Sequence, residues 1–219
     1  PTQPGKTDLR EVLARGVPVV VVDQRIESPG VDRVVVDNVA ATEAAVAHLA
    51  ANGYERIAFI GGPPAITTAK ERLLGYKRGL SAHGHPMEPQ LARRGDFHES
   101  GGHAEMSALL ALGTPPDAVI VANNTMTVGA LQALREARKR IPRDVGVVGF
   151  DETPWASLVE PPLTTVAQPT HELGLESARL LLSRIDGFQG ASREVVLRPE
   201  LHPRGSSAVR RRPVRLGRP

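Results

Sequence analysis

Short runs of valine and other apolar residues alternate along this chain with longer segments whose apolar residues recur at helical spacing. The run at residues 17–22 contains no polar residue, which is typical of a strand buried in a parallel sheet. Asp37 and Thr68 stand before segments of helical spacing and are predicted to cap helices. Strands are predicted within residues 17–23, 33–38, 56–62, 90–97, 117–122, 144–151, 163–168 and 193–201, and helices at residues 40–52, 68–84, 102–112, 125–140 and 172–185.

The alternation of strands and helices predicts βαβ units, and therefore an α/β fold with a mostly parallel sheet whose faces are covered by helices. In open parallel sheets, ligands bind beyond the carboxyl ends of the strands. The residues that follow the predicted strands are mostly polar: Asp23, Asp37, Gly61 and Gly62, Phe97, Asn123 and Asn124, and Asp151. Such a set, drawn from several strands, is typical of a site for a polar or polyhydroxylated small molecule.

The composition is that of a soluble globular protein, and it excludes several classes of site. The chain has 219 residues, of which 41% are apolar and 23% charged, and its length suits one large domain or two lobes. It contains no cysteine, which excludes disulfides, thiolate zinc sites and a cysteine nucleophile. No apolar run approaches the roughly 20 residues that span a bilayer, and no secretory leader is visible, so no membrane partner is expected.

The positive net charge is concentrated at one end of the chain. There are 27 basic and 24 acidic residues, and five of the arginines lie in residues 207–219, which contain no acid. We predict that this segment is a basic, disordered tail. The remaining 22 basic and 24 acidic residues leave the body with a net charge of −2, which does not indicate nucleic-acid binding.

No motif of catalytic or metal chemistry stands out. The glycines at residues 61–62 follow a strand but lack G-x-G-x-x-G spacing, and no phosphate-binding loop or G-x-S-x-G elbow occurs. The histidines at residues 83, 85, 98 and 103 lack an H-E-x-x-H arrangement and are predicted to be solvated. Asp96 and Glu99 could form a carboxylate pair, but nothing marks them as buried. We therefore predict no catalytic residue, metal or cofactor, and favour a binding module over an enzyme.

Six segments in sequence order carry a family resemblance. They are GVPVVVVDQ, DNVAATEAAVAHLAANGYERIAFIGGP, ERLLGYKRGL, GDFHESGG, PDAVIVANNTMTVGALQAL and IPRDVGVVGFDETPWASLVEPPLTTVAQP. Over about residues 16–205 the chain resembles the effector-binding core of LacI/GalR-type transcriptional regulators. The resemblance implies a two-lobed periplasmic-binding-protein-like α/β fold, with parallel sheets flanked by helices and three strands crossing between the lobes.

The resemblance also implies a division of the chain. Residues 1–37 and 168–195 would form the N-terminal lobe, which is then incomplete, and residues 38–165 and 196–206 the C-terminal lobe. Residues 207–219 would be the tail. Family members also carry an N-terminal helix-turn-helix and hinge, and no segment of this sequence resembles either.

Residue by residue, the resemblance implies ligand contacts from Asp23, Arg72, Phe97, Asn123, Asp151 and Gln168. Arg72 matches a cleft arginine whose planar fork suits hydroxyls or a carboxylate, and Phe97 matches an aromatic ring that stacks on the ligand. Asn123 and Asp151 would form hydrogen bonds with ligand hydroxyls. Asp23 would lie at the edge of the cleft, and Gln168 at the hinge. The alternatives are a surface arginine, core packing of the ring, and capping of the following segments.

The implied function is ligand sensing and dimerisation in a cytoplasmic DNA-binding regulator, most simply a repressor. Its partners would be a small sugar- or nucleoside-like effector, a second copy in a homodimer, and operator DNA reached only through a helix-turn-helix outside this sequence. Asn124, Thr127 and Glu152 depart from the family pattern and leave the effector's identity open. The alternative is an extracytoplasmic sugar-binding protein of a transporter, which would show a leader or a lipoprotein cysteine.

Overall fold

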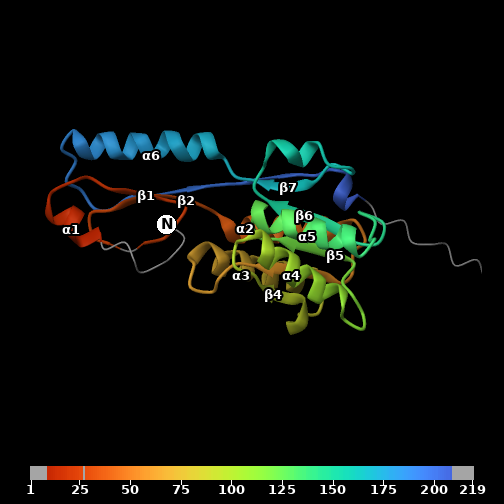
Figure 1. Ribbon diagram of the computed structural model, residues 1–219. Coiled ribbons are helices and arrows are strands. Elements are labelled where there is room, and N and C mark those ends of the chain that lie inside the picture. The colour runs from red at the N-terminus through yellow and green to blue at the C-terminus, as the bar shows by residue number, and fades with distance from the viewer. Residues whose placement is uncertain (1–8, 27, 209–219) are drawn as a thin grey trace, which may run out of the picture.

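The computed structural model describes residues 9–26 and 28–208, which form two bodies connected side by side (Figure 1). The strands are β1 (Val20–Val22), β2 (Asp32–Val36), β3 (Ile57–Gly61), β4 (Ala92–Arg94), β5 (Ala118–Val121), β6 (Gly146–Phe150), β7 (Thr164–Ala167), β8 (Glu194–Leu197) and β9 (Glu200–His202). The α-helices are α1 (Leu9–Ala14), α2 (Asn38–Ala51), α3 (Thr67–Ala82), α4 (Glu99–Leu110), α5 (Asn124–Glu136) and α6 (Thr170–Ile185). Three short 3-10 helices are η1 (Pro89–Leu91), η2 (Pro154–Ser157) and η3 (Gly205–Ser207).

The larger body is built on a six-stranded sheet in the order β4-β3-β5-β6-β7-β9, in which only β9 runs antiparallel to its neighbour. Every residue of β3, β5, β6 and β7 is buried, which explains the unbroken apolar character of the first three strands. β7 begins with two buried threonines, Thr164 and Thr165. The chain moves one way along the sheet from β3 to β4 and the other way from β4 to β6. Right-handed crossovers therefore place α3 on one face and α4 and α5 on the other.

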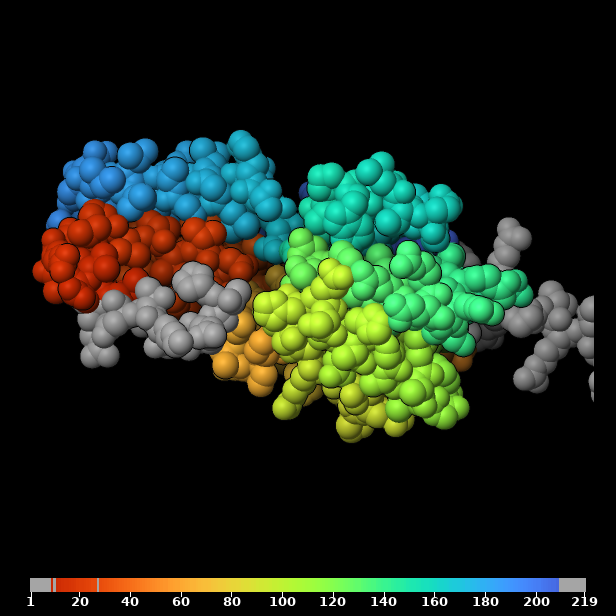
Figure 2. Space-filling model, viewed as in Figure 1, coloured from red at the N-terminus to blue at the C-terminus, as the bar shows by residue number. Residues whose placement is uncertain are grey.

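The smaller body is a parallel three-stranded sheet in the order β1-β2-β8, with α6 packed on one face. Its core cluster of buried apolar residues has four members among the described residues: Val34, Val36, Leu173 and Leu180. The corresponding cluster of the larger body has 30. In Figure 2 the two bodies are distinct, because red and blue residues gather in one and yellow to cyan residues in the other. The two-lobed parallel architecture is thus confirmed, with a small N-terminal lobe.

The chain passes between the lobes three times: after Val36, after Ala167, and between Leu197 and Glu200. The predicted extended segment at residues 193–201 is therefore two strands in different sheets. Residues 1–8, at the start of the predicted N-terminal lobe, and residues 209–219 of the predicted tail lie outside the described residues. Ser207, also placed in that tail, is fully buried and its hydroxyl lies 2.7 Å from His48 Nε2 of α2.

A buried carboxylate joins the elements of the small lobe. Asp32, which begins β2, is fully buried and lies 2.7 Å from both Arg184 of α6 and Arg193 before β8. Both guanidinium groups lie over the ring of Phe188, with distances to the ring centroid of 4.8 Å for Arg184 and 4.2 Å for Arg193. Burial opposes ionisation of Asp32, but the hydrogen bonds from both arginines hold its pKa well below the ordinary value.

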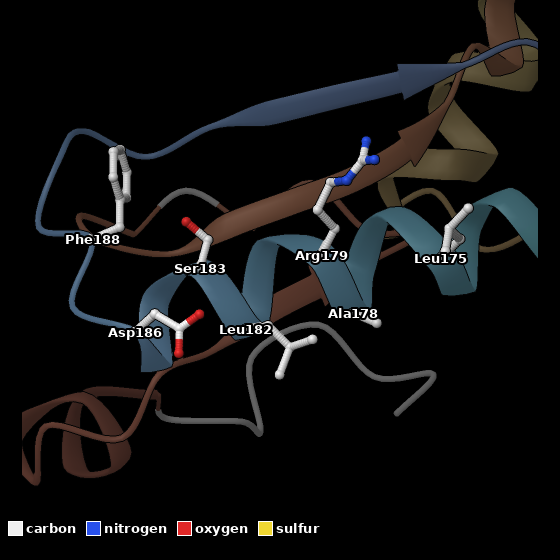
Figure 3. A pocket seen from close by; sticks show the side chains of 7 residues that line it. All are labelled: Leu175, Ala178, Arg179, Leu182, Ser183, Asp186 and Phe188. Carbon is white, nitrogen blue, oxygen red and sulfur yellow. The ribbon is translucent and has the colours of Figure 1, made fainter.

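The outward side of α6 remains apolar and exposed. Leu175, Leu182 and Ile185 are 54%, 58% and 60% exposed. A shallow hollow of about 660 Å³ lies along this side, lined by residues of α6, its last turn and Phe188 (Figure 3). Within the described part of the chain, no helix combines the length and the apolar character needed to cross a membrane.

Candidate functional site

Strained backbone marks the ends of three strands. Asp23 follows β1 with a φ of 66°, Asp151 follows β6 with a φ of 70°, and Phe97, shortly after β4, has a φ of 68°. Among the described non-glycine residues, only Arg138 also has a positive φ. A side chain in this region costs about 1–3 kcal/mol, and such strain clusters at functional sites. Three residues selected from the sequence as strand-end candidates therefore share an unusual conformation.

Arg72 lies in the interior and not on a helix surface. It is 4% exposed, and its Nε donates to Asn38 Oδ1 at 2.8 Å while Nη1 donates to the Ala122 carbonyl at the end of β5. Its guanidinium lies 4.3 Å over the ring of Phe150. A Cβ at Gly75 would lie 2.3 Å from a backbone carbonyl of α2, so glycine there allows the close packing that brings Arg72 to Asn38.

Two carboxylates face Arg72 from different lobes. Burial raises the pKa of Asp23 against the opposing charge of Arg72, and the charge of Asp151 raises it further. Burial likewise lowers the pKa of Arg72, and both carboxylates oppose that change. Asp23 Oδ1 is buried and accepts no hydrogen bond from any described residue. A buried acceptor without a donor costs about 1–3 kcal/mol, so this oxygen is a ready acceptor for a ligand.

Asp151 connects the strand ends to a crossing between the lobes. Gln168, which follows β7, donates from Nε2 to Asp151 Oδ1 at 2.5 Å. The backbone N–H of Asn124, the first residue of α5, donates to Asp151 Oδ2 at 3.3 Å. A carboxylate is favourable at a helix N-terminus. A movement of the lobes that shifts Gln168 would therefore change its hydrogen bond with Asp151.

Asn123 and Phe97 form the next part of the same network. Asn123 Oδ1 accepts from the Met126 N–H and so caps α5, while Nδ2 donates to the Phe97 carbonyl at 3.2 Å. The Phe97 ring lies against Gly62, where a Cβ would come 2.1 Å from it. Asn123 thus fixes the loop that presents Phe97, and its amide nitrogen carries a second hydrogen for another partner.

These contacts join all six predicted residues into one neighbourhood at the junction of the lobes. Asn38 and Phe150, which hold the Arg72 guanidinium, are not among the residues predicted from the sequence. Their signal was adjacency, because each stands next to an aspartate at a strand end. The contacts that link the small lobe to α3 were likewise not predicted: Thr67 Oγ1 donates to Gln24 Oε1 at 3.2 Å, and Arg25 pairs with Glu71 at 2.7 Å.

The chemistry of this neighbourhood is that of hydrogen bonding. A guanidinium, two carboxylates and two amides supply donors and acceptors beside an aromatic ring, the combination that binds hydroxyl-bearing small molecules. Among the residues the structure describes, no group of three or more histidine or acidic side chains is arranged to hold a metal ion.

Comparisons with known proteins agree with this architecture. The family of periplasmic binding protein-like domains matches residues 46–207. The HTH-type transcriptional regulator CelR of Thermobifida fusca is 39% identical over 193 residues, which are 87% of this chain and 57% of CelR. The structure of a CelR–cellobiose complex matches 87% of this chain and 59% of that chain, with a TM-score of 0.82 and 39% identity.

A LacI-family regulatory protein from Chloroflexus aggregans matches with a TM-score of 0.82 and 30% identity, over 90% of this chain and 71% of that one. This chain spans little more than half the length of the curated relative CelR.

Proposed function

Since this chain belongs to the periplasmic binding protein-like domains, and among them to the effector-binding cores of LacI-type transcriptional regulators, we propose that it is the ligand-sensing core of a repressor. Its effector is a small sugar- or nucleoside-like molecule bound between the lobes. The relatives named above are regulators, which favours this function over that of a transporter's binding protein.

One observation supports the proposal more than any other. Asp23, Phe97 and Asp151 hold strained backbone around the buried Arg72, where an Asp23 oxygen has no donor among the described residues. Folding alone gives no reason to keep such costs together. A ligand hydroxyl that donates to Asp23 and accepts from Arg72 would supply the missing donor and remove the cost of the unpaired Asp23 oxygen.

We assign the following roles. Arg72 donates to ligand oxygens, Asp23 and Asp151 accept from hydroxyls, and the Phe97 ring stacks on an apolar face of the ligand. Asn123 positions the Phe97 loop and offers its second amide hydrogen. Gln168 carries a change at Asp151 to the crossing after β7.

We also propose the lobe division of residues 1–37 and 168–195 against residues 38–165 and 196–206, with one adjustment. Val196 and Leu197 pair with β2 and belong with the small lobe. A ligand that touches both lobes favours the closed arrangement by its differential affinity for it. In the longer regulator this closure would change operator binding through a helix-turn-helix domain, by about 1–3 kcal/mol. A cytoplasmic homodimer is part of the same proposal.

Isothermal titration calorimetry tests the effector site. We expect one member of a panel of cellobiose, other sugars and nucleosides to bind the parent chain. Arg72→Met should weaken that binding at least about tenfold, because a buried charged hydrogen bond contributes roughly 1.5–3 kcal/mol. Arg78→Met, an exposed change on the same helix, is the matched control and should leave the heats unchanged. Equal affinity for the parent and Arg72→Met would remove Arg72 from the site.

A further inference from the structure

Besides the hollow along α6, a second hollow lies in the large lobe, and none of the six candidate site residues lines it. It lies between α3, the end of β3, and the edge strand β4, and its volume is about 220 Å³. We refer to it as the α3–β4 groove. An engineered cavity of about 150 Å³ holds benzene, so this volume suits one ring or a short alkyl chain with a small substituent.

The floor of the α3–β4 groove is apolar. Phe59 of β3, Leu73 of α3 and Ala92 of β4 line it, and Phe59 is fixed from beneath by stacking on Tyr76 with a centroid distance of 5.1 Å. Met87, in the loop before η1, forms one wall and is 39% exposed. An apolar group bound here would be removed from water and would contact apolar side chains on several sides, which favours binding.

The rim is cationic. Lys70 and Lys77 lie seven residues apart on α3, two turns of one helix face, and Arg93 and Arg94 lie on β4. Arg93 is paired with Glu105 at 2.6 Å. The charged groups of the other three form no hydrogen bond or ion pair with any described residue, and no acidic side chain lines the groove.

We infer that the α3–β4 groove binds a small organic anion, which has a ring-sized or short-chain apolar body and one carboxylate, sulfonate or phosphate group. The apolar body lies on Phe59 and Leu73, and the anionic group meets Lys70, Lys77 and Arg94. A rim of cations alone would attract any anion, and an apolar floor alone any hydrocarbon. The two together select a molecule that carries both features.

Methyl NMR of methionine gives a direct test on the full 219-residue chain, with phenyl phosphate as the probe. The chain has three methionines, of which Met87 lines the groove, while Met106 and Met126 are fully buried elsewhere. Phenyl phosphate should shift the Met87 signal saturably. Phenol and inorganic phosphate, each lacking one feature, should bind at least about fivefold more weakly.

Lys70→Gln combined with Lys77→Gln should weaken the binding of phenyl phosphate about fivefold, because it removes two exposed charge interactions. Lys139→Gln combined with Arg143→Gln removes the same charge from exposed positions elsewhere and should change nothing. The inference is overturned if Met87 does not shift, if inorganic phosphate shifts it equally well, or if Met126, near the junction of the lobes, responds in its place. Failure here leaves the effector titration untouched, since that experiment reports on Arg72.

Discussion

Replacing Asp32 by alanine removes the carboxylate at the centre of the small lobe. Its two oxygens accept five hydrogen bonds: two from the Arg184 guanidinium at 2.7 and 3.0 Å, and three from Arg193 at 2.7, 2.8 and 3.2 Å. The Arg184 side chain is 9% exposed and the Arg193 side chain 31%. Asp32→Ala therefore leaves one nearly buried cation without its counter-ion, and a second that can recover part of its hydration.

Breaking a buried pair by removing one partner costs about 3–5 kcal/mol. The exposure of Arg193 and the carbonyl contacts that Arg184 keeps with Gly190 and Ala191 favour the lower end, about 3 kcal/mol. At about 0.05–0.15 kcal/mol per residue, a small lobe of roughly 60 residues has about 3–9 kcal/mol of stability. The substitution should therefore remove a large share of that stability while leaving the large lobe folded.

Amide hydrogen exchange separates the two lobes in one measurement. At pH 7, protection in β1, β2 and β8 should fall about 100-fold in Asp32→Ala, while β3, β5 and β6 keep theirs. Glu176→Ala, which removes an exposed pair with Arg179 from the same lobe, is the control and should change protection little. A fall of less than about tenfold in the small sheet, or an equal fall in both sheets, would refute the reasoning.

The same prediction has a definite pH dependence. Because the folded-state pKa of Asp32 is depressed, its contribution is present above the ordinary value of 3.8 and is lost as the pH falls through the lower, folded-state value. The difference between the parent and Asp32→Ala should be full at pH 7 and shrink below about pH 4. A difference that grows in acid would contradict the assigned cause.

Three further changes give sharp outcomes. Asp23→Asn should raise the free energy of unfolding of the ligand-free chain by about 1 kcal/mol at pH 7, because the raised pKa of Asp23 shows that folding disfavours its charged form. This gain should vanish below the ordinary pKa of 3.8, where the carboxyl group is protonated in both states. Effector binding should weaken in the same variant. Gly102→Ala places a Cβ 2.1 Å from backbone of α5 and should cost at least about 2 kcal/mol in urea unfolding, whereas Gly113→Ala, with open space around it, should be neutral. Arg25→Ala breaks the pair with Glu71 across the lobes and should enlarge the ligand-free radius of gyration in X-ray scattering, with a stability change near 0.5 kcal/mol; an unchanged radius would show that the pair does not hold the lobes together.

The elements of the large lobe follow closely from the sequence, because its four central strands, β3, β5, β6 and β7, are buried throughout and each helix pairs with a neighbour. Asp37 caps α2 as predicted, since its side chain accepts from the Ala40 N–H at 3.0 Å. The prediction for Thr68 is wrong: α3 begins at Thr67 after Ile66, with no side-chain cap. The helix is held by packing instead, which a local cap signal does not report.

The sequence predicts the small lobe less well, because its strands pair with partners that are distant in the sequence. The apolar run at residues 17–22 yields only the three-residue β1, since it pairs with β2 alone at the edge of the sheet. The segment at residues 193–201 reads as continuously extended, but Pro199, which has no N–H, separates β8 in one sheet from β9 in the other. The helix α1 was not predicted. Register and sheet membership are set by contacts far apart in the sequence.

At the candidate site, strand ends could be found from the sequence, while the network between them could not. Asp23 and Asp151 were selected because polar residues at the carboxyl ends of parallel strands converge. The burial of Arg72 depends on Asn38 and Phe150, which the pattern places within two predicted strands, at residues 33–38 and 144–151. No local pattern reports that a charged side chain on a helix points inward beneath a strand end.

The strained backbone and the buried polar groups are divided unequally between the lobes, and this division bears on how a ligand would act. Two of the three strained residues, together with the buried Arg72, belong to the large lobe, whose 30-residue cluster can hold them in place without a ligand. The third, Asp23, is presented by the short edge strand β1 of a lobe whose core cluster has four buried apolar residues. A ligand that satisfies Asp23 therefore acts on the weaker partner, where a few kcal/mol is a large fraction of the total. The large lobe is then the preorganised half of the site, and the small lobe is the half whose position a ligand can change.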